Sequence, residues 1–572
     1  MPRTISIGNQ TFSSLRENNY FYVDKTSFIK EWWNGGAQVT LITRPRRFGK
    51  TLNMNMLECF FSNHYENRAD LFEGLSVWNE EKFRKLQGTF PVIFLSFAEI
   101  KSQNFESMKK AVLDLVNDVY KSYSNLLDSN ILSESEKKFF AELDELSISI
   151  EKIEIQDEIL TRSIKKLSMY LERYYKKKVI ILLDEYDTPM QEAYINGFWD
   201  ETVSFMRAFF NSTFKTNPYM ERSVLTGITR VSKESIFSDF NNPDVITTTS
   251  EQYAASFGFT EKEVFDSLDE MGLPEKKAEV KKWYDGFVFG SQKDIYNPWS
   301  ITSYLKNRIL KPYWAQTSSN SLVGKLLRQG SAETKKALED LIEGKAIVKR
   351  IDEQIVFNYL DKDEEAVWSF LLASGYLKSE SVDYRGETLE PYHTLRITNI
   401  ETKATLENLM KGWFSSSVSS YNSFVKYLLE GDKKAMNFYM NKIALETFSL
   451  FDAGGKPSEF AEPERFYHGF ILGLMVERRE DYVIKSNRES GFGRYDVVMI
   501  PKDKNNPKTP AIVLEFKVFD KDEEKDLQDS VNAALKQIAD KNYDADLLSC
   551  GVKSEMIRHY GFAFCGKKVL IG

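Results

Sequence analysis

The sequence predicts an α/β protein of several domains. Two parts of the chain, residues 37–230 and 459–572, alternate short apolar runs of strand length with longer stretches of helical periodicity. The region between them is mostly helical in pattern, and the Gly-Gly-Lys-Pro-Ser stretch at 454–458 is typical of a linker. We therefore expect the following four segments, in chain order: 1–235, a helical lid-like extension over 236–320, a helical or winged-helix-like middle region over 321–453, and a second α/β domain over 459–572.

The composition is that of an ordinary globular protein. The chain has 572 residues, which at roughly 100–200 residues per domain corresponds to about three or four domains. Apolar residues make up 42% and charged residues 28%, which excludes a disordered or collagen-like chain. The 76 Lys and Arg against 84 Asp and Glu leave a net charge of −8, so any contact with nucleic acid requires a local basic patch.

The expected compartment is the cytoplasm. Cys59, Cys550 and Cys565 are too few and too scattered for a disulfide framework or a Cys-rich zinc site. The N-terminus lacks the apolar segment of a signal peptide, and the longest apolar runs are far below the ~20 residues of a membrane-spanning helix. We therefore expect a soluble protein with no membrane partner, and the possibility of a homo-oligomer stays open.

The elements of the first domain alternate as a mainly parallel sheet requires. In chain order the patterns predict a strand at 37–42, a helix from 51, a strand at 91–97, helices within 102–175, a strand at 176–187, a helix at 199–215 and a strand at 222–230. In the middle region, a helical stretch at 366–380 is followed by a hairpin-like stretch at 393–399, which fits a small winged-helix-like module. The last domain is expected to contain a helix at 462–476, strands near 481–486, 494–500 and 511–518, and a helix at 526–541.

A Gly-Lys-Thr sequence follows the first strand. It ends the stretch Arg44-Pro45-Arg46-Arg47-Phe48-Gly49-Lys50-Thr51. In a P-loop the backbone N–H groups surround the phosphates, the lysine reaches the β- and γ-phosphates, and the threonine hydroxyl is a ligand of Mg²⁺. Arg44 stands where that motif has its first glycine, and a Gly-Lys-Thr sequence alone equally fits an exposed start of a helix. The interpretation therefore depends on the second half of such a site.

The second half of a P-loop site is an apolar strand that ends in acidic residues. Val179–Leu183 is such a strand, and Asp184 and Glu185 follow it. In this arrangement Asp184 belongs to the shell of Mg²⁺, and Glu185 orients or deprotonates the attacking water. The alternative, two carboxylates that cap a buried strand, is disfavoured because both halves are present. The sequence therefore predicts a site for ATP and Mg²⁺.

Other polar residues are candidates for the same site. Thr226 and Arg230 end the strand at 222–230, where a polar residue can sense the γ-phosphate and an arginine can offset charge, although an ordinary strand end is the alternative. Arg46 and Arg47 either compensate for the unusual loop or are solvated surface residues. The predicted ATP-binding residues are thus Arg46, Arg47, Phe48, Gly49, Lys50, Thr51, Thr226 and Arg230, with Thr51 and Asp184 as metal ligands.

A second constellation lies in the C-terminal domain. Asp496 belongs to one predicted strand. Glu515, which lies 19 residues after Asp496, and Lys517 belong to the next strand. Glu515 and Lys517 project from the same face of their strand. Two carboxylates on adjacent strands can share Mg²⁺, and the lysine can orient or activate a water that attacks phosphorus. Short patterns of this kind are common, but a Glu and a Lys that face one way at the end of an apolar strand need a reason.

The helix before these strands offers further candidates. Glu464 is the expected additional metal ligand, and Glu462 is the alternative. His468 lies one turn after Glu464 and is better explained as a packed helix residue than as a ligand.

Several segments resemble one known family. They are FYVDKT (21–26), TRPRRFGKT (43–51), LLDEYDTP (182–189), LTGITR (225–230), WYDGF (283–287) and YNPWS (296–300). Over residues 3–320 these segments resemble, in the same order, the AAA-ATPase-like family, a prokaryotic P-loop family whose members commonly carry a C-terminal PD-(D/E)xK nuclease domain. Residues 465–470 and Gln537-Ile538 resemble that nuclease domain over about 460–572.

The resemblance implies an ASCE-type ATPase fold and a restriction-endonuclease-like C-terminal domain. It also implies that the YVDKT segment borders the nucleotide pocket. There, Tyr22 and Asp24 either shape the base or ribose side of the pocket or form a structural N-terminal motif.

Two functions remain after this reasoning. The first is an ATP-dependent or ATP-regulated nuclease that uses Mg²⁺ and acts on nucleic acid, DNA rather than RNA, with defence against foreign DNA suggested by the pairing of domains. The second is a nucleotide-controlled switch whose C-terminal domain binds nucleic acid or protein without cutting it. The complete set Asp496, Glu515 and Lys517 favours the first, with Glu185 as the catalytic residue of the ATPase.

Overall fold

A parallel sheet occupies the centre of the N-terminal part of the computed structural model. Among the described residues its strands are β1 (Val39–Thr43), β2 (Val92–Ser96), β3 (Val179–Asp184), β4 (Met220–Gly227) and β5 (Asp244–Ile246), in the order β2-β3-β4-β1-β5. Each adjacent pair is parallel. The structure describes residues 2–148, 157–230, 243–314, 321–329, 332–353, 364–412, 421–441, 478, 481–490, 493–504, 506, 509–520, 524–565 and 568–572.

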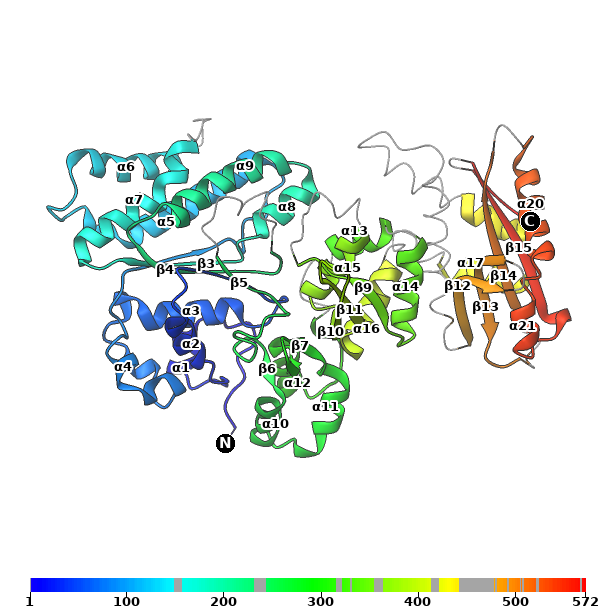
Figure 1. The fold of residues 1–572 in the computed structure, drawn as a ribbon, viewed down its shortest axis with the longest axis horizontal. Coiled ribbons are helices and arrows are strands. Elements are labelled where there is room, and N and C mark those ends of the chain that lie inside the picture. Colours follow the sequence, from blue (N-terminus) through cyan, green and yellow to red (C-terminus); the bar gives the residue numbers. More distant parts are fainter. Residues whose placement is uncertain are drawn as a thin grey trace. The chain divides into compact units, whose positions relative to one another are not determined.

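Helices cover both faces of this sheet (Figure 1). On one face lie α1 (Phe12–Glu17), α2 (Ser27–Gly35), α3 (Lys50–Phe61) and α4 (Glu81–Arg84); on the other lie α5 (Phe105–Ser122), α6 (Glu134–Ile148), α7 (Asp157–Tyr175) and α9 (Trp199–Phe210). The short helix α8 (Thr188–Asn196) follows β3. Every residue of β3 is buried, as expected for a central strand covered on both faces. The carboxyl ends of the strands are therefore the open edge at which a ligand can bind.

The predicted lid-like extension is helical and also contains a small antiparallel sheet. Its helices are α10 (Glu261–Glu270), α11 (Lys277–Tyr284) and α12 (Pro298–Asn307), and its strands are β6 (Phe259–Thr260), β7 (Phe287–Phe289) and β8 (Gln292–Tyr296). A capping box of Thr260 and Glu263 begins α10. Asn297 caps α12, and Pro298 occupies its first position.

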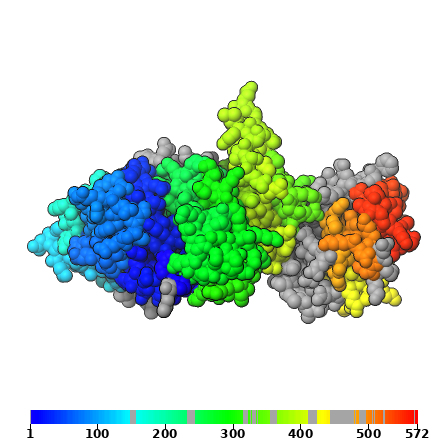
Figure 2. Space-filling view, turned by 90° about the horizontal axis from the view of Figure 1, so that it is seen from below, coloured from blue at the N-terminus to red at the C-terminus, as the bar shows by residue number. Residues whose placement is uncertain are grey.

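The middle of the chain contains a helix followed by a hairpin, but the helix is shorter than the predicted 366–380, because residues 377–380 belong to the first strand of the hairpin. α15 (Glu364–Ala373) precedes β10 (Leu377–Arg385) and β11 (Glu390–Ile397), and β9 (Ile347–Arg350) completes a sheet of order β10-β11-β9. α16 (Ile400–Gly412) follows the hairpin. Figure 2 shows the yellow-green hairpin standing out from the surface. This arrangement is compatible with a winged-helix-like module, which stays a prediction.

The C-terminal part is built on a mixed sheet. Its strands are β12 (Tyr482–Ser490), β13 (Gly493–Pro501), β14 (Ala511–Val518), β15 (Ile557–Cys565) and β16 (Lys568–Ile571), in chain order across the sheet. Only β14 and β15 are parallel among the described pairs. Alternate residues of β13 and β14 face two separate cores: Met499 packs with α17 (Tyr421–Glu430), and Val498 packs with α20 (Leu527–Asp540). The short helix α21 (Ala545–Ser549) completes the second core.

The chain divides into two units whose boundaries differ from the predicted ones. Unit 1 comprises Met1–Ser318 and Val348–Lys403, and unit 2 comprises Ser319–Ile347 and Ala404–Gly572. Helices α13 (Ser321–Gln329) and α14 (Ala332–Ile342) thus belong to unit 2. Residues 421–441, which the sequence analysis grouped with the middle region, pack on the C-terminal sheet because their apolar side chains cover its inner face. The predicted linker at 454–458 lies outside the described residues.

In the described part of the chain, none of the helices combines the length and the apolar character that crossing a membrane requires.

Candidate nucleotide and metal sites

The loop between β1 and α3, residues 44–49, is called the nucleotide loop below. Gly49, the N-cap of α3, has φ +81°, a left-handed conformation that glycine adopts without strain. Lys50, which is 3% exposed, curls back so that its Nζ donates to the carbonyl oxygens of Arg44 (3.2 Å) and Pro45 (3.3 Å). The N-terminus of α3 and the lysine ammonium thus lie at one end of the loop, as phosphate binding requires.

The predicted acidic pair meets this loop. Oγ1 of Thr51 donates to Oδ2 of Asp184 at 2.7 Å, and Oγ1 of Thr226 donates to the other oxygen of Asp184. Glu185 lies 3.2 Å from the Nζ of Lys50. Two strands, β3 and β4, and the helix α3 therefore bring together five residues that were predicted to form one site.

Asp184 is buried beside a second carboxylate. Burial, with Glu185 next to it, raises the pKa of Asp184 to about 6. A cation placed between Thr51 and Asp184 would lower that pKa again, and the hydroxyl and carboxylate oxygens there are the ligands that Mg²⁺ prefers. The donor set therefore fits a magnesium ion.

Asp187 is a residue of this site that the sequence analysis did not single out. It is fully buried, and its Oδ2 accepts hydrogen bonds from the backbone N–H groups of Ile228 and Thr229 and from the side chains of Thr229 and Gln191. Burial raises its pKa. Asp187 thereby connects the turn after β3 to the residues that follow β4. In the sequence, only its position within the segment LLDEYDTP (182–189) indicated that it could belong to this site.

Arg44, which stands in place of the first glycine, points away from the loop. Its guanidinium is fully buried and donates to the backbone carbonyls of Thr43, Thr247 and Gln252. It also lies 4.7 Å from the ring centre of Phe289. Burial lowers the pKa of Arg44 to about 9. This arginine is a structural anchor behind the loop.

The side chains of Arg46, Arg47 and Phe48 each have a different kind of contact. The guanidinium of Arg46 donates to Gln191 at 3.3 Å, and that of Arg47 lies 4.3 Å above the ring centre of Trp299. The ring of Phe48 is 1% exposed and packs in a cluster with Phe287, Phe289 and Ile295. Because this ring is enclosed, only the backbone of Phe48 is available to a nucleotide.

Three further candidates were named from the sequence. Arg230 lines a small pocket with Thr43, Thr247 and Glu353. The hydroxyl of Tyr22 contacts Sδ of Met56 at 3.4 Å. The carboxylate of Asp24 accepts hydrogen bonds from Thr26 and from the backbone of Ser76. These contacts favour the structural alternative for Tyr22 and Asp24.

The C-terminal candidates also meet. Asp496 on β13 accepts a hydrogen bond from the backbone N–H of Phe516 on β14 at 2.7 Å. Gln537 on α20 donates to Glu515 and accepts from the Nζ of Lys517 at 2.5 Å. A single amide thus holds the glutamate and the lysine of β14 side by side, and Tyr543 accepts a further bond from it at 3.0 Å.

Glu515 has the properties of a metal ligand. It is 3% exposed, and among the described residues its Oε2 has no hydrogen-bond partner. Burial and then the charge of Asp496 raise the pKa of Glu515 to about 8. A buried carboxylate oxygen without a donor, beside a second carboxylate, fits a divalent cation.

Glu464, the predicted additional ligand, lies outside the described residues, as do its alternative Glu462 and His468.

Comparison with known proteins gives a family for each of these two parts. Residues 6–237 match the family model described as predicted AAA-ATPase, and residues 462–572 match the model of the PD-(D/E)XK nuclease superfamily. The chain carries an AAA-ATPase-like domain and a PD-(D/E)XK nuclease superfamily domain. It is also similar to a protein of Azotobacter chroococcum mcd 1 described as an uncharacterized protein in the vnfD 5' region, with 26% identity over 411 residues, or 71% of this chain and 70% of that protein.

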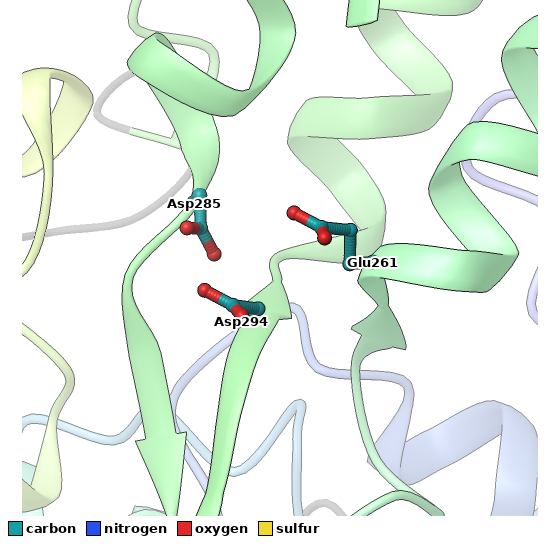
Figure 3. Close-up of side chains that lie close together, drawn as sticks. All are labelled: Glu261, Asp285 and Asp294. Atoms are coloured by element: carbon teal, nitrogen blue, oxygen red, sulfur yellow. The ribbon is translucent and has the colours of Figure 1, made fainter. Parts of the chain in front are cut away.

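Between the AAA-ATPase-like and PD-(D/E)XK domains, the lid-like extension holds one more acidic cluster. Glu261, Asp285 and Asp294 offer oxygen atoms that lie within 4.8 Å of one another (Figure 3). Lys281 pairs with Glu261 and lies 3.8 Å from Asp294. Burial and then Asp294 raise the pKa of Asp285 to about 7. The ammonium of Lys281 therefore offsets part of the negative charge of this cluster.

Proposed function

We propose that the protein binds and hydrolyses ATP in its AAA-ATPase-like domain and cleaves nucleic-acid phosphodiester bonds in its PD-(D/E)XK domain. The observation that carries the proposal is the assembly of two polar constellations from separate strands. One consists of Lys50, Thr51, Asp184 and Thr226, and the other of Asp496, Glu515 and Lys517 held through Gln537.

The order of strands in the N-terminal sheet supports an ASCE-type ATPase fold. β4 lies between β1, which leads into the nucleotide loop, and β3, which ends in the acidic pair. That inserted strand brings Thr226 next to Asp184, where it can respond to the γ-phosphate. The parallel strands all open toward the loop, as expected for a site at their carboxyl ends.

The residues of the proposed ATP site have separable roles. Lys50 leaves the carbonyls of Arg44 and Pro45 to offset the charge of the β- and γ-phosphates. Thr51 and Asp184 would hold Mg²⁺, which would supply positive charge to the phosphates. Glu185, released from Lys50, orients or deprotonates the attacking water, and Arg230, which follows β4, offsets charge in the transition state.

The nuclease site has a similar division of labour. Asp496 and Glu515 would hold Mg²⁺, with Glu464 as a further candidate, and the ion would supply positive charge to stabilise the leaving oxygen. Lys517 orients or deprotonates the water that attacks phosphorus. Gln537 keeps Lys517 beside Glu515.

We also infer a cytoplasmic protein whose substrate is DNA rather than RNA and whose role is defence against foreign DNA. The three cysteines are free thiols in the structure, which agrees with a reducing compartment.

The experiment that tests the proposal measures both activities in the same purified full-length protein. ATP hydrolysis and the cleavage of plasmid, single-stranded DNA and RNA are followed with Mg²⁺ or Mn²⁺ and ATP. We expect Lys50→Ala to lose at least about 10³-fold in ATP hydrolysis. Glu185→Gln should retain bound ATP, because only water activation is lost.

The nuclease half has its own variants. Asp496→Asn, Glu515→Ala and Lys517→Ala should each abolish cleavage and leave ATP hydrolysis intact, whereas the exposed Glu555→Ala serves as a control. Mn²⁺ should raise the unfolding temperature of wild type and Lys517→Ala, and should not do so for the two carboxylate variants. Full protein that cuts no nucleic acid, with metal stabilisation unchanged in Glu515→Ala, would favour a nucleotide-controlled binding switch.

A further inference from the structure

The nucleotide loop is held from outside at one carbonyl group. The carbonyl oxygen of Arg46 accepts two hydrogen bonds, from Nδ2 of Asn297 and from Nε1 of Trp314, each of 3.2 Å. The two donors are 251 and 268 residues away in the sequence. In a planar trans peptide the C=O and the following N–H point in opposite directions. Fixing the carbonyl of Arg46 toward these donors therefore turns the N–H of Arg47 to the opposite side.

The amide of Asn297 has only one orientation that satisfies its neighbours. Asn297 is fully buried and is the N-cap of α12. Its Oδ1 accepts hydrogen bonds from the backbone N–H groups of Trp299 (2.9 Å) and Ser300 (3.3 Å). The Nδ2 group is thereby directed at the carbonyl of Arg46, so that the start of α12 and the loop are joined by one side chain.

Trp314 is fixed just as firmly. Its backbone N–H donates to Oε1 of Glu401 on α16 at 2.8 Å, and its ring lies 4.9 Å from that of Tyr376. Glu401 is fully buried and also accepts hydrogen bonds from the hydroxyl of Ser300 at 2.8 and 2.9 Å. One carboxylate therefore anchors both α12, which Asn297 caps, and Trp314. The two side chains that donate to the carbonyl of Arg46, Asn297 and Trp314, are called the clamp below.

The parts of the loop on either side of this carbonyl are also restrained. Gly375, next to Tyr376, lies so close to the loop that an added Cβ would meet the ring of Pro45 at 2.9 Å. On the other side, the backbone N–H of Gly258 donates to the carbonyl of Phe48 at 3.2 Å. The loop lacks the first glycine of the usual motif, and its shape is instead imposed by residues far downstream.

We propose that Asn297 and Trp314 are positioning residues of the ATP site, which hold the Arg46–Arg47 peptide with its N–H turned toward the phosphates. This inference rests on the proposed ATPase function and adds a structural cause for the binding geometry of an unusual loop. It also assigns a role to the segment YNPWS (296–300), because Asn297 of this segment supplies one of the two donors to the carbonyl of Arg46.

The test uses substitutions that remove a donor and keep the packing. Trp314→Phe keeps an aromatic ring beside Tyr376 and lacks the indole N–H. Asn297→Ser keeps a good N-cap for α12, but its hydroxyl is too short to reach Arg46. Trp283→Phe and Asn104→Ser are controls for the same substitutions: Trp283 is a partly buried tryptophan of the same unit, and Asn104 is an exposed N-cap residue, of α5.

The measurements are ATP binding by calorimetry, ATP hydrolysis over a range of ATP concentrations, and unfolding of the nucleotide-free full-length protein. Each donor variant should weaken ATP binding about two- to tenfold, which is the range for one lost hydrogen bond, and the double variant should weaken it further. The KM for ATP should rise in parallel while kcat changes by less than about twofold. The unfolding temperature should stay with that of the controls, which a purely structural role would not predict.

The outcomes separate this inference from the proposed function. If Lys50→Ala loses ATP binding but both donor variants bind ATP as wild type does, the clamp is not a positioning device and the ATPase assignment stands. If Lys50→Ala binds ATP normally, the ATPase assignment itself fails. Should Trp314→Phe not fold, Asn297→Ser alone decides.

Discussion

Among single residues, Arg44 shows most clearly that a departure from the usual P-loop motif has a structural role. A glycine at this position would restore the usual P-loop motif. In the structure, however, the buried guanidinium supplies the donors for the carbonyls of Thr247 and Gln252. We therefore expect Arg44→Gly to lower the free energy of unfolding by about 3 kcal/mol or more and to weaken ATP binding. Arg308→Gly is the control, because Arg308 is exposed with φ +58°, where glycine is favoured.

Denaturant unfolding and ATP titration of the two variants check this prediction. A stable Arg44→Gly protein that binds ATP more tightly than wild type would contradict the anchoring role of Arg44.

Glu401 predicts a pH dependence of stability. Burial raises the pKa of Glu401 to about 7, above its ordinary value in the unfolded chain. The folded state then binds more protons than the unfolded state between about pH 4.5 and 7, so the contribution of Glu401 to stability falls as pH rises through that window. The full effect is about 3 kcal/mol.

Glu401→Gln removes this titration and keeps a hydrogen-bond acceptor for Ser300 and Trp314. We expect its unfolding temperature, relative to wild type, to be higher at pH 8 than at pH 5. The exposed Glu387→Gln should show the same difference from wild type at both pH values, and identical behaviour of Glu401→Gln would refute the prediction.

At the scale of elements, α20 decides the geometry of the nuclease site. The helix packs on β14 and β15, and this packing delivers Gln537 to both Glu515 and Lys517. Removing a residue that orients ligands commonly costs about 10- to 100-fold in activity. We therefore expect Gln537→Ala to lower nucleic-acid cleavage by that factor and to leave ATP hydrolysis unchanged. Gln528→Ala, an exposed residue of the same helix, should cleave normally, and equal rates for the two variants would remove Gln537 from the site.

At the scale of the whole molecule, the predicted linker at 454–458 and the hydrogen bonds between residues 437–441 and β16 together predict how the cut protein behaves. The composition of residues 454–458 predicts an early site of limited proteolysis. The side chains of Asn437 and Asn441, before that stretch, form hydrogen bonds with the backbone of Ile571 and Val569 on β16. A chain cut at the linker should therefore elute as one complex under native conditions and separate only in denaturant. Fragments that separate at once would show that this interface does not hold unit 2 together.

The sequence alone was sufficient for the features that depend on local pattern. An apolar run followed by Asp184-Glu185, a strand followed by Gly49-Lys50-Thr51, and a Glu-x-Lys strand end each report chemistry within a few residues, because strand and helix periodicity place neighbouring side chains predictably. The succession of strands and helices in the two α/β parts followed from such patterns, and the family of both parts followed from the resemblance of whole motif segments.

Only the tertiary structure decided which side chains serve the sites and which serve the core. Phe48 and Arg44 belong to the loop in sequence, yet both are buried against residues more than 200 positions away. The donors to the carbonyl of Arg46, and the packing of residues 421–441 on the C-terminal sheet, likewise join segments distant in the chain. Contacts of this kind leave no periodic signal, because they depend on how separately formed elements pack together.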